Sequence, residues 1–224
     1  MKKIRILDVE FENDISAWEV PALRGAIVAT VGREHFLFHN HIDKVFRYSY
    51  PLIQYKRIGK KPHLVCVEMG VDDIHNFFEN KQEGIILGNR PYELKVDKLS
   101  LNNFTLQVWD SNFNYFLQDW LPLNQKNYKD FKTLKSEIDQ LEFLEKILKG
   151  NVLSFAKGID WYIEKEIKLR IQNIVRVSPI SYKGIKLEAF TINFSSNISL
   201  PNNIGLGKNA SLGFGVLRNI IDKK

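Results

Sequence analysis

Apolar and polar positions alternate at the start of the chain, over residues 3–11 (KIRILDVEF), and this alternation predicts a first β-strand. A helical pattern follows. Leu23, Ile27 and Val31 recur at a spacing of four residues, which places them on one stripe and predicts a helix over residues 22–31. The chain is therefore expected to begin with a strand followed by a helix.

Two strand-like runs, residues 45–56 and 63–70, flank the turn RIGKKP at residues 57–62 and predict a β-hairpin. A short helix over residues 72–80 and a closing strand within residues 83–99 follow. The resulting order, β-α-β-β-α-β in about the first hundred residues, is the plan of a ferredoxin-like domain, which RNA-binding sheet modules also use. Gly25 in the first helix indicates a close contact with a neighbouring element.

The second half repeats this plan with one element changed. Apolar residues at helical spacing predict a helix from Lys126 to Gly150, where Gly150 is expected to end it, and a second short helix over residues 151–159. The strand-like runs are residues 104–109, 114–121, 168–180, 183–194 and 214–221. We expect the fold class α+β, with two tandem ferredoxin-like (RRM-like) domains, 1–100 and 101–224, built on antiparallel sheets. In the second domain, a glycine-rich loop shortens or replaces the second helix.

This glycine-rich segment, GLGKNASLGFG at residues 205–215, combines backbone freedom with a cation. Its candidate ligand-binding residues are Gly205, Gly207, Lys208, Gly213, Phe214 and Gly215. Glycine permits positive φ and lets a bulky anion approach the backbone N–H groups, and Phe214 is expected to point into a core or onto a base. The alternative is a flexible hairpin between two strands, since the spacing matches neither a P-loop nor a dinucleotide-binding fingerprint.

Charge is unevenly distributed along the chain of 224 residues, whose formal net charge is +6. Residues 151–224 hold 11 Lys and Arg against 5 Asp and Glu, whereas residues 1–150 hold 21 of each. A basic surface of this kind suits a polyanion, because each neutralised phosphate releases counterions. A solvated surface that keeps the protein soluble is the alternative.

Cysteine content and apolar run lengths indicate the cellular compartment. The single cysteine, Cys66, lies in the apolar run LVCV, where a buried and inert thiol is expected. No signal-peptide core is present, because Asp8 and Glu10 interrupt the first apolar stretch, and no apolar run approaches the roughly 18 residues of a membrane span. We therefore expect a cytoplasmic protein that does not bind a membrane.

Three histidines, His35, His39 and His41, fall within seven residues just after the first helix. In an extended segment His39 and His41 project from the same side. Two imidazoles of pKa about 6.5 exchange protons near neutral pH, as cleavage of RNA by its own 2′-OH requires. Two alternatives remain open: a three-histidine zinc site, and histidines that only cap an irregular loop.

Aromatic and basic residues alternate directly after the histidines. They are Arg47, Tyr48, Tyr50, Gln54, Tyr55, Lys56 and Arg57. Aromatic rings stack on bases, a phenol donates to a phosphate oxygen, and cations stabilise charge that develops during phosphodiester cleavage. An ordinary strand with buried tyrosines is the alternative, and it is the interpretation we favour for Tyr55.

Four segments together resemble the CRISPR-associated endoribonucleases of the RAMP superfamily, which cut precursor CRISPR RNA within its repeats. They are RGAI on the first helix, LFHNH beyond it, FRYSYPLIQYK on the next strand, and GLGKNASLGFG near the C-terminus. The resemblance implies two tandem ferredoxin-like domains and cleavage without a metal or other cofactor, leaving a 5′-hydroxyl and a 2′,3′-cyclic phosphate or its opened form. It also implies a catalytic histidine in the loop after the first helix, with a tyrosine shortly downstream.

On this resemblance we expect an endoribonuclease acting on CRISPR repeat RNA. His41 is the first candidate catalytic residue, His39 the second, and Tyr48 the tyrosine, with Tyr50 as the alternative. Lys56, Arg57 and the glycine-rich segment are the expected RNA contacts. A homodimer and binding to subunits of an interference complex stay open, and a non-catalytic RAMP subunit that only binds guide RNA is the alternative function.

Overall fold

The computed structural model describes residues 1–39, 41–42, 45–46, 49–80, 84–182 and 184–220, and for residues 41–42 and 45–46 it describes the backbone alone. Contacts divide the chain into two units. The N-terminal unit comprises residues 3–105 and 211–213, and the C-terminal unit comprises residues 1–2, 106–210 and 214–220. The domain boundary expected at residues 100 and 101 falls inside a strand, β8 (Val96–Leu106).

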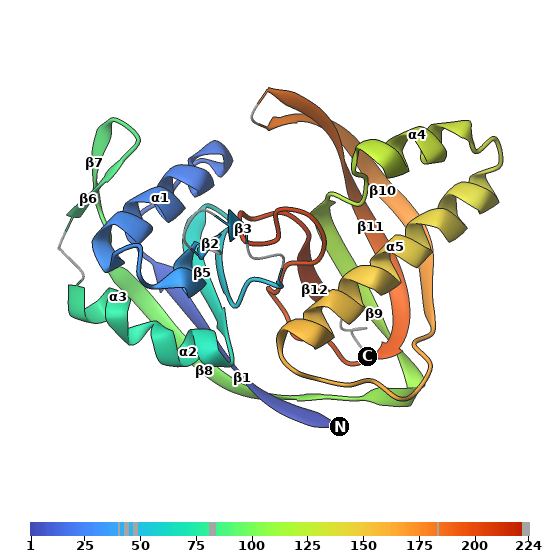
Figure 1. Ribbon diagram of the computed structural model, residues 1–224, viewed down its shortest axis with the longest axis horizontal. Helices are drawn as coiled ribbons and strands as arrows, with labels where there is room; N and C mark the ends of the chain where they lie inside the picture. Colours follow the sequence, from blue (N-terminus) through green and yellow to red (C-terminus); the bar gives the residue numbers. More distant parts are fainter. Residues whose placement is uncertain (40, 43–44, 47–48, 81–83, 183, 221–224) are drawn as a thin grey trace. The chain divides into compact units, whose positions relative to one another are not determined.

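The N-terminal unit has the expected ferredoxin-like order. Its sheet runs β4–β5–β1–β8, with β4 at Ile53–Ile58, β5 at Lys61–Val67 and β1 at Lys2–Phe11. The helices α1 (Val20–Val31), α2 (Met69–Asp73) and α3 (His75–Asn80) lie on one face of this sheet (Figure 1). Leu23, Ile27 and Val31 of α1 are buried, which confirms the predicted stripe.

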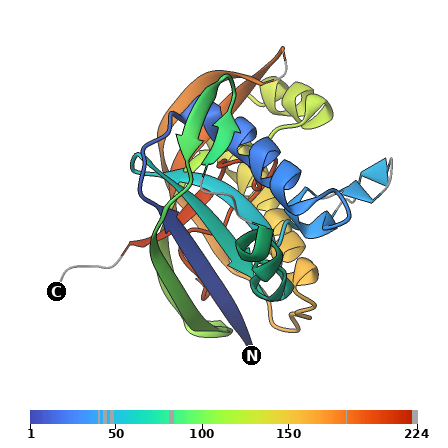
Figure 2. The same ribbon diagram turned by 90° about the vertical axis from the view of Figure 1, so that its left-hand side faces the viewer.

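Two short hairpins add to this unit. One joins β2 (His41–Ile42) to β3 (Val45–Phe46), and the other joins β6 (Gly84–Leu87) to β7 (Arg90–Glu93) and extends beyond the sheet (Figure 2). The predicted closing strand over residues 83–99 is therefore wrong. The chain reverses at Gly88, which has φ +64°, so the closing strand begins only at Val96.

The C-terminal unit has the same strand order with a different second connection. Its sheet runs β10–β11–β9–β12, with β9 at Val108–Trp120, β10 at Leu169–Tyr182, β11 at Ile185–Ile198 and β12 at Val216–Ile220. The helix α5 (Glu137–Gly158) lies across one face of it (Figure 1). Residues 199–215 connect β11 to β12 and contain no helix, as predicted.

The helix predicted from Lys126 to Gly150 is two helices, and Gly150 does not end the second. The first, α4 (Gln125–Thr133), ends where Leu134 turns extended, at ψ 122°. The second, α5, continues through Gly150 to Gly158, so residues 151–159 do not form a separate helix. The apolar stripe explains this, because Val152 and Phe155 are fully buried and continue the pattern past the glycine.

Two further expectations concern glycine and membranes. The close contact expected at Gly25 is absent, since no described heavy atom lies within 4 Å of the position that a Cβ would take. In the described part of the chain, no helix has the length and apolar character that spanning a membrane requires.

Candidate functional site

The segment after α1 is held by two buried apolar side chains. Residues Phe36–Phe38 form a single 3₁₀ turn, η2, in which Leu37 and Phe38 are buried. His39 follows directly, half-buried, and its backbone N–H donates to the carbonyl oxygen of Phe36 at 3.2 Å. The apolar pair therefore anchors the backbone directly before His39.

Two hydrogen bonds hold the ring and the backbone of His39. Its Nε2 lies 2.7 Å from the carbonyl oxygen of Arg33, and its own carbonyl accepts from the guanidinium of Arg24 on α1. A carbonyl oxygen only accepts, so Nε2 carries a proton. In the neutral ring, Nδ1 is then the basic nitrogen, which is the property that a general base needs.

The other histidines of this loop differ in their surroundings. His35 has its Nε2 3.9 Å from a carboxylate oxygen of Glu34. His41 begins β2, where its backbone pairs with Phe46, and its side chain lies outside the described atoms. Tyr48 lies outside the described residues. Among the side chains that the structure describes, no three histidine, cysteine or acidic groups gather to hold a metal ion. The three-histidine alternative includes His41 and so extends beyond them.

Two tyrosines that follow the histidine segment are interior, Tyr50 before β4 and Tyr55 within it. Tyr50 is 7% exposed, and its hydroxyl accepts from Gln54 Nε2 at 2.8 Å. Tyr55 is fully buried, and its hydroxyl donates to the carbonyl oxygen of Phe38 at 3.0 Å. Burial raises the pKa of Tyr55 above its ordinary value, and the charge of Arg24 opposes this only in part. The interpretation of Tyr55 as a buried strand tyrosine is confirmed.

Neither cation of β4, Lys56 or Arg57, is fully exposed. The Lys56 side chain has no exposed surface, and burial lowers its pKa to about 7 although the charge of Asp8 opposes the shift. An RNA contact needs an exposed cation, so the expectation for Lys56 is wrong in this structure. Arg57 is half-buried, and its Nε donates to the carbonyl oxygen of Ile15 at 2.7 Å.

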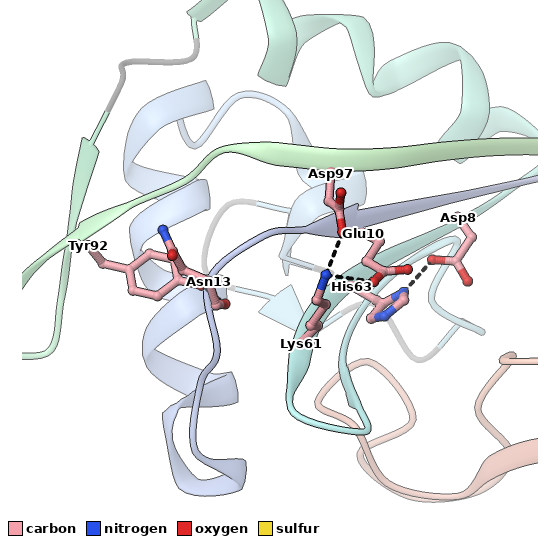
Figure 3. Close-up of polar contacts among 7 residues, drawn as sticks. All are labelled: Asp8, Glu10, Asn13, Lys61, His63, Tyr92 and Asp97. Atoms are coloured by element: carbon pink, nitrogen blue, oxygen red, sulfur yellow. Dashed lines mark hydrogen bonds and ion pairs between the residues drawn. The ribbon is translucent and has the colours of Figure 1, made fainter.

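A cluster of cations and carboxylates lies beside Lys56, and it was not predicted from the sequence. Lys56, His63 and Glu10 are opposite one another in the registers of β4, β5 and β1, so they share one face of the sheet. His63 Nδ1 lies 2.7 Å from Asp8 Oδ1, and Lys61 Nζ lies 3.3 Å from Glu10 Oε1 and also contacts Asp97. Figure 3 shows these side chains pointing toward one another. Acidic partners thus compensate the cations here, and this face is no basic patch.

The glycine-rich segment is required by the fold. Gly207, Gly213 and Gly215 have φ values of +89°, +84° and +61°. A Cβ at Gly215 would lie 1.9 Å from the carbonyl oxygen of Leu206, and one at Gly207 would lie 2.7 Å from Trp120 Nε1. Both distances are too short for a real side chain, so these glycines permit close approach of backbone and ring.

Several N–H groups of this segment bond within the protein. Leu206 donates to the Gly215 carbonyl at 2.9 Å, Gly215 to the Asp119 carbonyl at 3.1 Å, and Lys208 to the Leu121 carbonyl at 3.4 Å. The expected cradle of consecutive N–H groups turned toward one ligand is therefore absent at these three positions.

Side chains supply the polar groups that the segment presents. The Lys208 side chain is exposed, and Phe214 is half-buried with its ring edge-to-face with Tyr182 at 6.4 Å. Among the described side chains, Asn209 Nδ2 is a buried nitrogen without a hydrogen-bond partner. A local rearrangement that gave this donor an acceptor would relieve the cost of its burial.

Residues 211–213 of this segment belong to the N-terminal unit. The backbone N–H of Tyr55 donates to the carbonyl oxygen of Ser211 at 2.9 Å, and Tyr55 forms a parallel bridge with Leu212, which is buried. Two segments that the sequence places far apart, the histidine loop and the glycine-rich segment, therefore both contact Tyr55.

A basic groove in the C-terminal unit was also missed. Its volume is about 680 Å³, and it lies between the start of α4 and β11. Three lysines, Lys126, Lys129 and Lys186, line it against two carboxylates, Asp130 and Glu188, so its cations exceed its anions by one. Tyr128, two amide side chains and apolar side chains complete the lining. The spacing of three residues between Lys126 and Lys129 on a helix was the available signal, because it places both cations on one face.

The chain resembles known proteins along its whole length. A model of the Cas6b N-terminal domain matches residues 2–105, and a model of the Cas6b C-terminal domain matches residues 107–220. An uncharacterised protein of Methanocaldococcus jannaschii is 40% identical over 142 residues, which are 58% of this chain and 93% of the relative.

Solved structures show the same architecture. A crystal structure of Cas6b is 27% identical, with a TM-score of 0.89, and the match covers 98% of this chain and 100% of that one. A crystal structure of a CRISPR RNA processing endoribonuclease, also a Cas6b, is 23% identical, with a TM-score of 0.76 and the same coverage. The fold, with two ferredoxin-like domains in one chain, is thus shared with these proteins.

Proposed function

Because the chain belongs to the Cas6b family, we propose that it is an endoribonuclease that cleaves CRISPR repeat RNA. The observation that carries this proposal is the match of Cas6b models to both domains, together with a solved Cas6b described as a CRISPR RNA processing endoribonuclease. The histidine loop after α1 supplies chemistry that suits this reaction.

The proposed reaction uses the RNA's own 2′-OH as the nucleophile and needs no metal. One imidazole of the pair His39 and His41 removes the 2′ proton, and the other protonates the departing 5′ oxygen. Tyr48 is proposed to donate to a phosphate oxygen as charge develops there. The products carry a 2′,3′-cyclic phosphate and a 5′-hydroxyl. His39 suits the role of base because its Nε2 proton is held by the Arg33 carbonyl, which makes Nδ1 the basic atom.

RNA is proposed to be held by both units. Lys208 offers an exposed cation in the glycine-rich segment, and Phe214 offers part of a ring for stacking. Arg57 is half-buried and offers its remaining guanidinium donors. Lys126, Lys129 and Lys186 line a groove in which an RNA backbone would displace counterions. A charge-dependent affinity that falls with salt follows from this arrangement.

The test replaces His39 and His41 together with alanine and uses RNA of the host's own repeat. Single-turnover cleavage should fall by about 10³-fold or more, because general acid and base each contribute about 10²–10⁴. The dissociation constant for the RNA should change by less than about threefold, since the lysines that hold the phosphates remain. His75→Ala is the matched control, because His75 is an exposed histidine at the start of α3, outside the loop.

Mapping of the product ends separates the remaining alternatives. A cyclic phosphate, formed in the presence of a chelator, supports the proposed reaction. Loss of cleavage with chelator and its return with zinc would identify the three-histidine metal site instead. Binding of repeat RNA by the wild-type protein without any product would identify a non-catalytic RNA-binding subunit.

A further inference from the structure

Tyr55 occupies a position between the two segments that the proposed function needs. It lies in β4, is fully buried, and makes one hydrogen bond through its side chain and another through its backbone. The side chain reaches Phe38 at the end of η2, and the backbone N–H reaches Ser211 of the glycine-rich segment. A single residue therefore contacts the histidine loop on one side and the glycine-rich segment on the other.

The side-chain bond fixes the peptide that precedes His39. Phe38 is the last residue of η2, and the carbonyl groups at a helix end lack partners within the helix. The Tyr55 hydroxyl donates to this carbonyl at 3.0 Å. The guanidinium of Arg24 donates to the next carbonyl, that of His39. The peptide groups on both sides of His39 are thus held, which restricts where its ring can point.

The backbone bond fixes the glycine-rich segment. In the order β4–β5–β1–β8, β4 is an edge strand, so its outward N–H groups need a partner outside the sheet. The Ser211 carbonyl accepts from Tyr55 at 2.9 Å, and Leu212 bridges to Tyr55 in parallel orientation. A Cβ on Gly213 would lie 3.7 Å from the Tyr55 carbonyl oxygen, so the segment lies directly against this residue.

We propose that Tyr55 is a positioning residue that couples the glycine-rich segment to the histidine loop. RNA bound beside residues 211–213 would set the position of Tyr55, and the Tyr55 hydroxyl would set the orientation of His39. The inference depends on the proposed function for its catalytic consequence. It predicts that loss of the hydroxyl changes the rate of cleavage rather than the affinity for RNA.

The first experiment compares Tyr55→Phe with Tyr115→Phe. Tyr115 is a buried tyrosine of the C-terminal unit whose hydroxyl donates to the Ile198 carbonyl at 2.7 Å and accepts from the Leu200 N–H at 2.9 Å. Its loss therefore removes at least as many buried hydrogen bonds as the loss of the Tyr55 hydroxyl, but it contacts neither segment. In single-turnover assays with saturating repeat RNA, Tyr55→Phe should cleave about 10- to 100-fold more slowly, as expected for a misplaced catalytic group. Its RNA affinity should stay within about twofold of the wild type, because the hydroxyl contacts no phosphate. Equal cleavage by both variants would overturn the proposal.

A second experiment tests the coupling without relying on cleavage. Hydrogen exchange of residues 36–39 is measured in Gly213→Ala and in Gly59→Ala. Both glycines have positive φ, +84° and +63°, but Gly59 lies in the β4–β5 turn with no described atom within 4 Å of its Cβ position. Gly213→Ala should raise exchange at the His39 amide, and Gly59→Ala should not.

The two experiments can refute the proposed function and the coupling independently. A wild-type protein that does not cut repeat RNA would refute the proposed function, and the exchange result would still decide the coupling. Unchanged exchange at residues 36–39 in Gly213→Ala would refute the coupling even if the enzyme is active.

Discussion

The two units share one strand order but connect their last two strands in different ways. In the N-terminal unit α2, α3 and a hairpin lie between β5 and β8. In the C-terminal unit residues 199–215 make this connection without a helix, and three glycines there have positive φ. One connection is held by side chains of helices and the other by close approach of the backbone. The second is therefore much less tolerant of added side-chain atoms.

The units also differ in what they bury. Among the described residues, the N-terminal unit buries the ionisable groups of Glu19, Lys56 and His63. The polar residues buried in the C-terminal unit are all neutral: Thr191, Ser196, Asn197 and Ser199. Stability of the N-terminal unit should therefore depend on pH through Lys56 and Glu19, whose pKa values are both lowered in the fold.

The largest effect is expected from Gly215→Ala. An added Cβ would lie 1.9 Å from the Leu206 carbonyl oxygen at a φ of +61°, so backbone must move. The loss in unfolding free energy should be about 3 kcal/mol or more, since strain and displacement add. Gly84→Ala in the corresponding connection of the N-terminal unit is the control, because its nearest contact is an ordinary 3.6 Å. Urea unfolding of both variants measures the contrast, and equal losses would contradict the difference between the two connections.

Lys56→Met tests the buried cation through pH. The folded-state pKa of Lys56 is lowered to about 7, whereas the unfolded value is about 10.4, so between these values the unfolded chain binds more protons. Wild-type stability should therefore rise with pH above about 7, by up to about 1.4 kcal/mol per pH unit from this group. The advantage of Lys56→Met over the wild type should be largest below pH 7 and shrink above it.

Unfolding at several pH values between 6 and 9 measures this difference. Lys61→Met is the control, because the carboxylates of Asp97 and Glu10 raise the pKa of Lys61 and keep it charged throughout this range. Its difference from the wild type should stay constant. A constant difference for Lys56→Met as well would show that Lys56 is not deprotonated in the folded protein.

Local patterns predicted the fold well where packing and propensity agree. The stripe of Leu23, Ile27 and Val31 and the β4–β5 hairpin were visible because burial follows a simple period. The predicted helix end at Gly150 was wrong. A glycine commonly ends a helix, but the buried Val152 and Phe155 beyond it stabilise the continuation of α5. Packing between distant segments outweighed the local signal.

The candidate site was predictable in position but not in detail. The histidine loop could be located because unusual residues cluster there. The burial of Lys56 could not, because the alternation of β4 does not show that the second face of its sheet is also covered. The contact of Tyr55 with Ser211 joins residues that are more than 150 positions apart, and no local pattern indicates such a pairing.

The smallest expected effect compares one long helix of each unit, α1 and α5. Gly25 in α1 and Gly150 in α5 are both exposed, and neither has a described atom within 4 Å of its Cβ position. Alanine at either site should raise the unfolding free energy by about 0.5–1 kcal/mol, because it removes backbone freedom from the unfolded chain without a clash.

Thermal unfolding and the rate of RNA cleavage are measured for both variants. Equal stabilisation with unchanged cleavage would show that both are ordinary helix positions. Slower cleavage by Gly25→Ala alone would show that α1, which carries Arg24 beside His39, needs its glycine for RNA to approach.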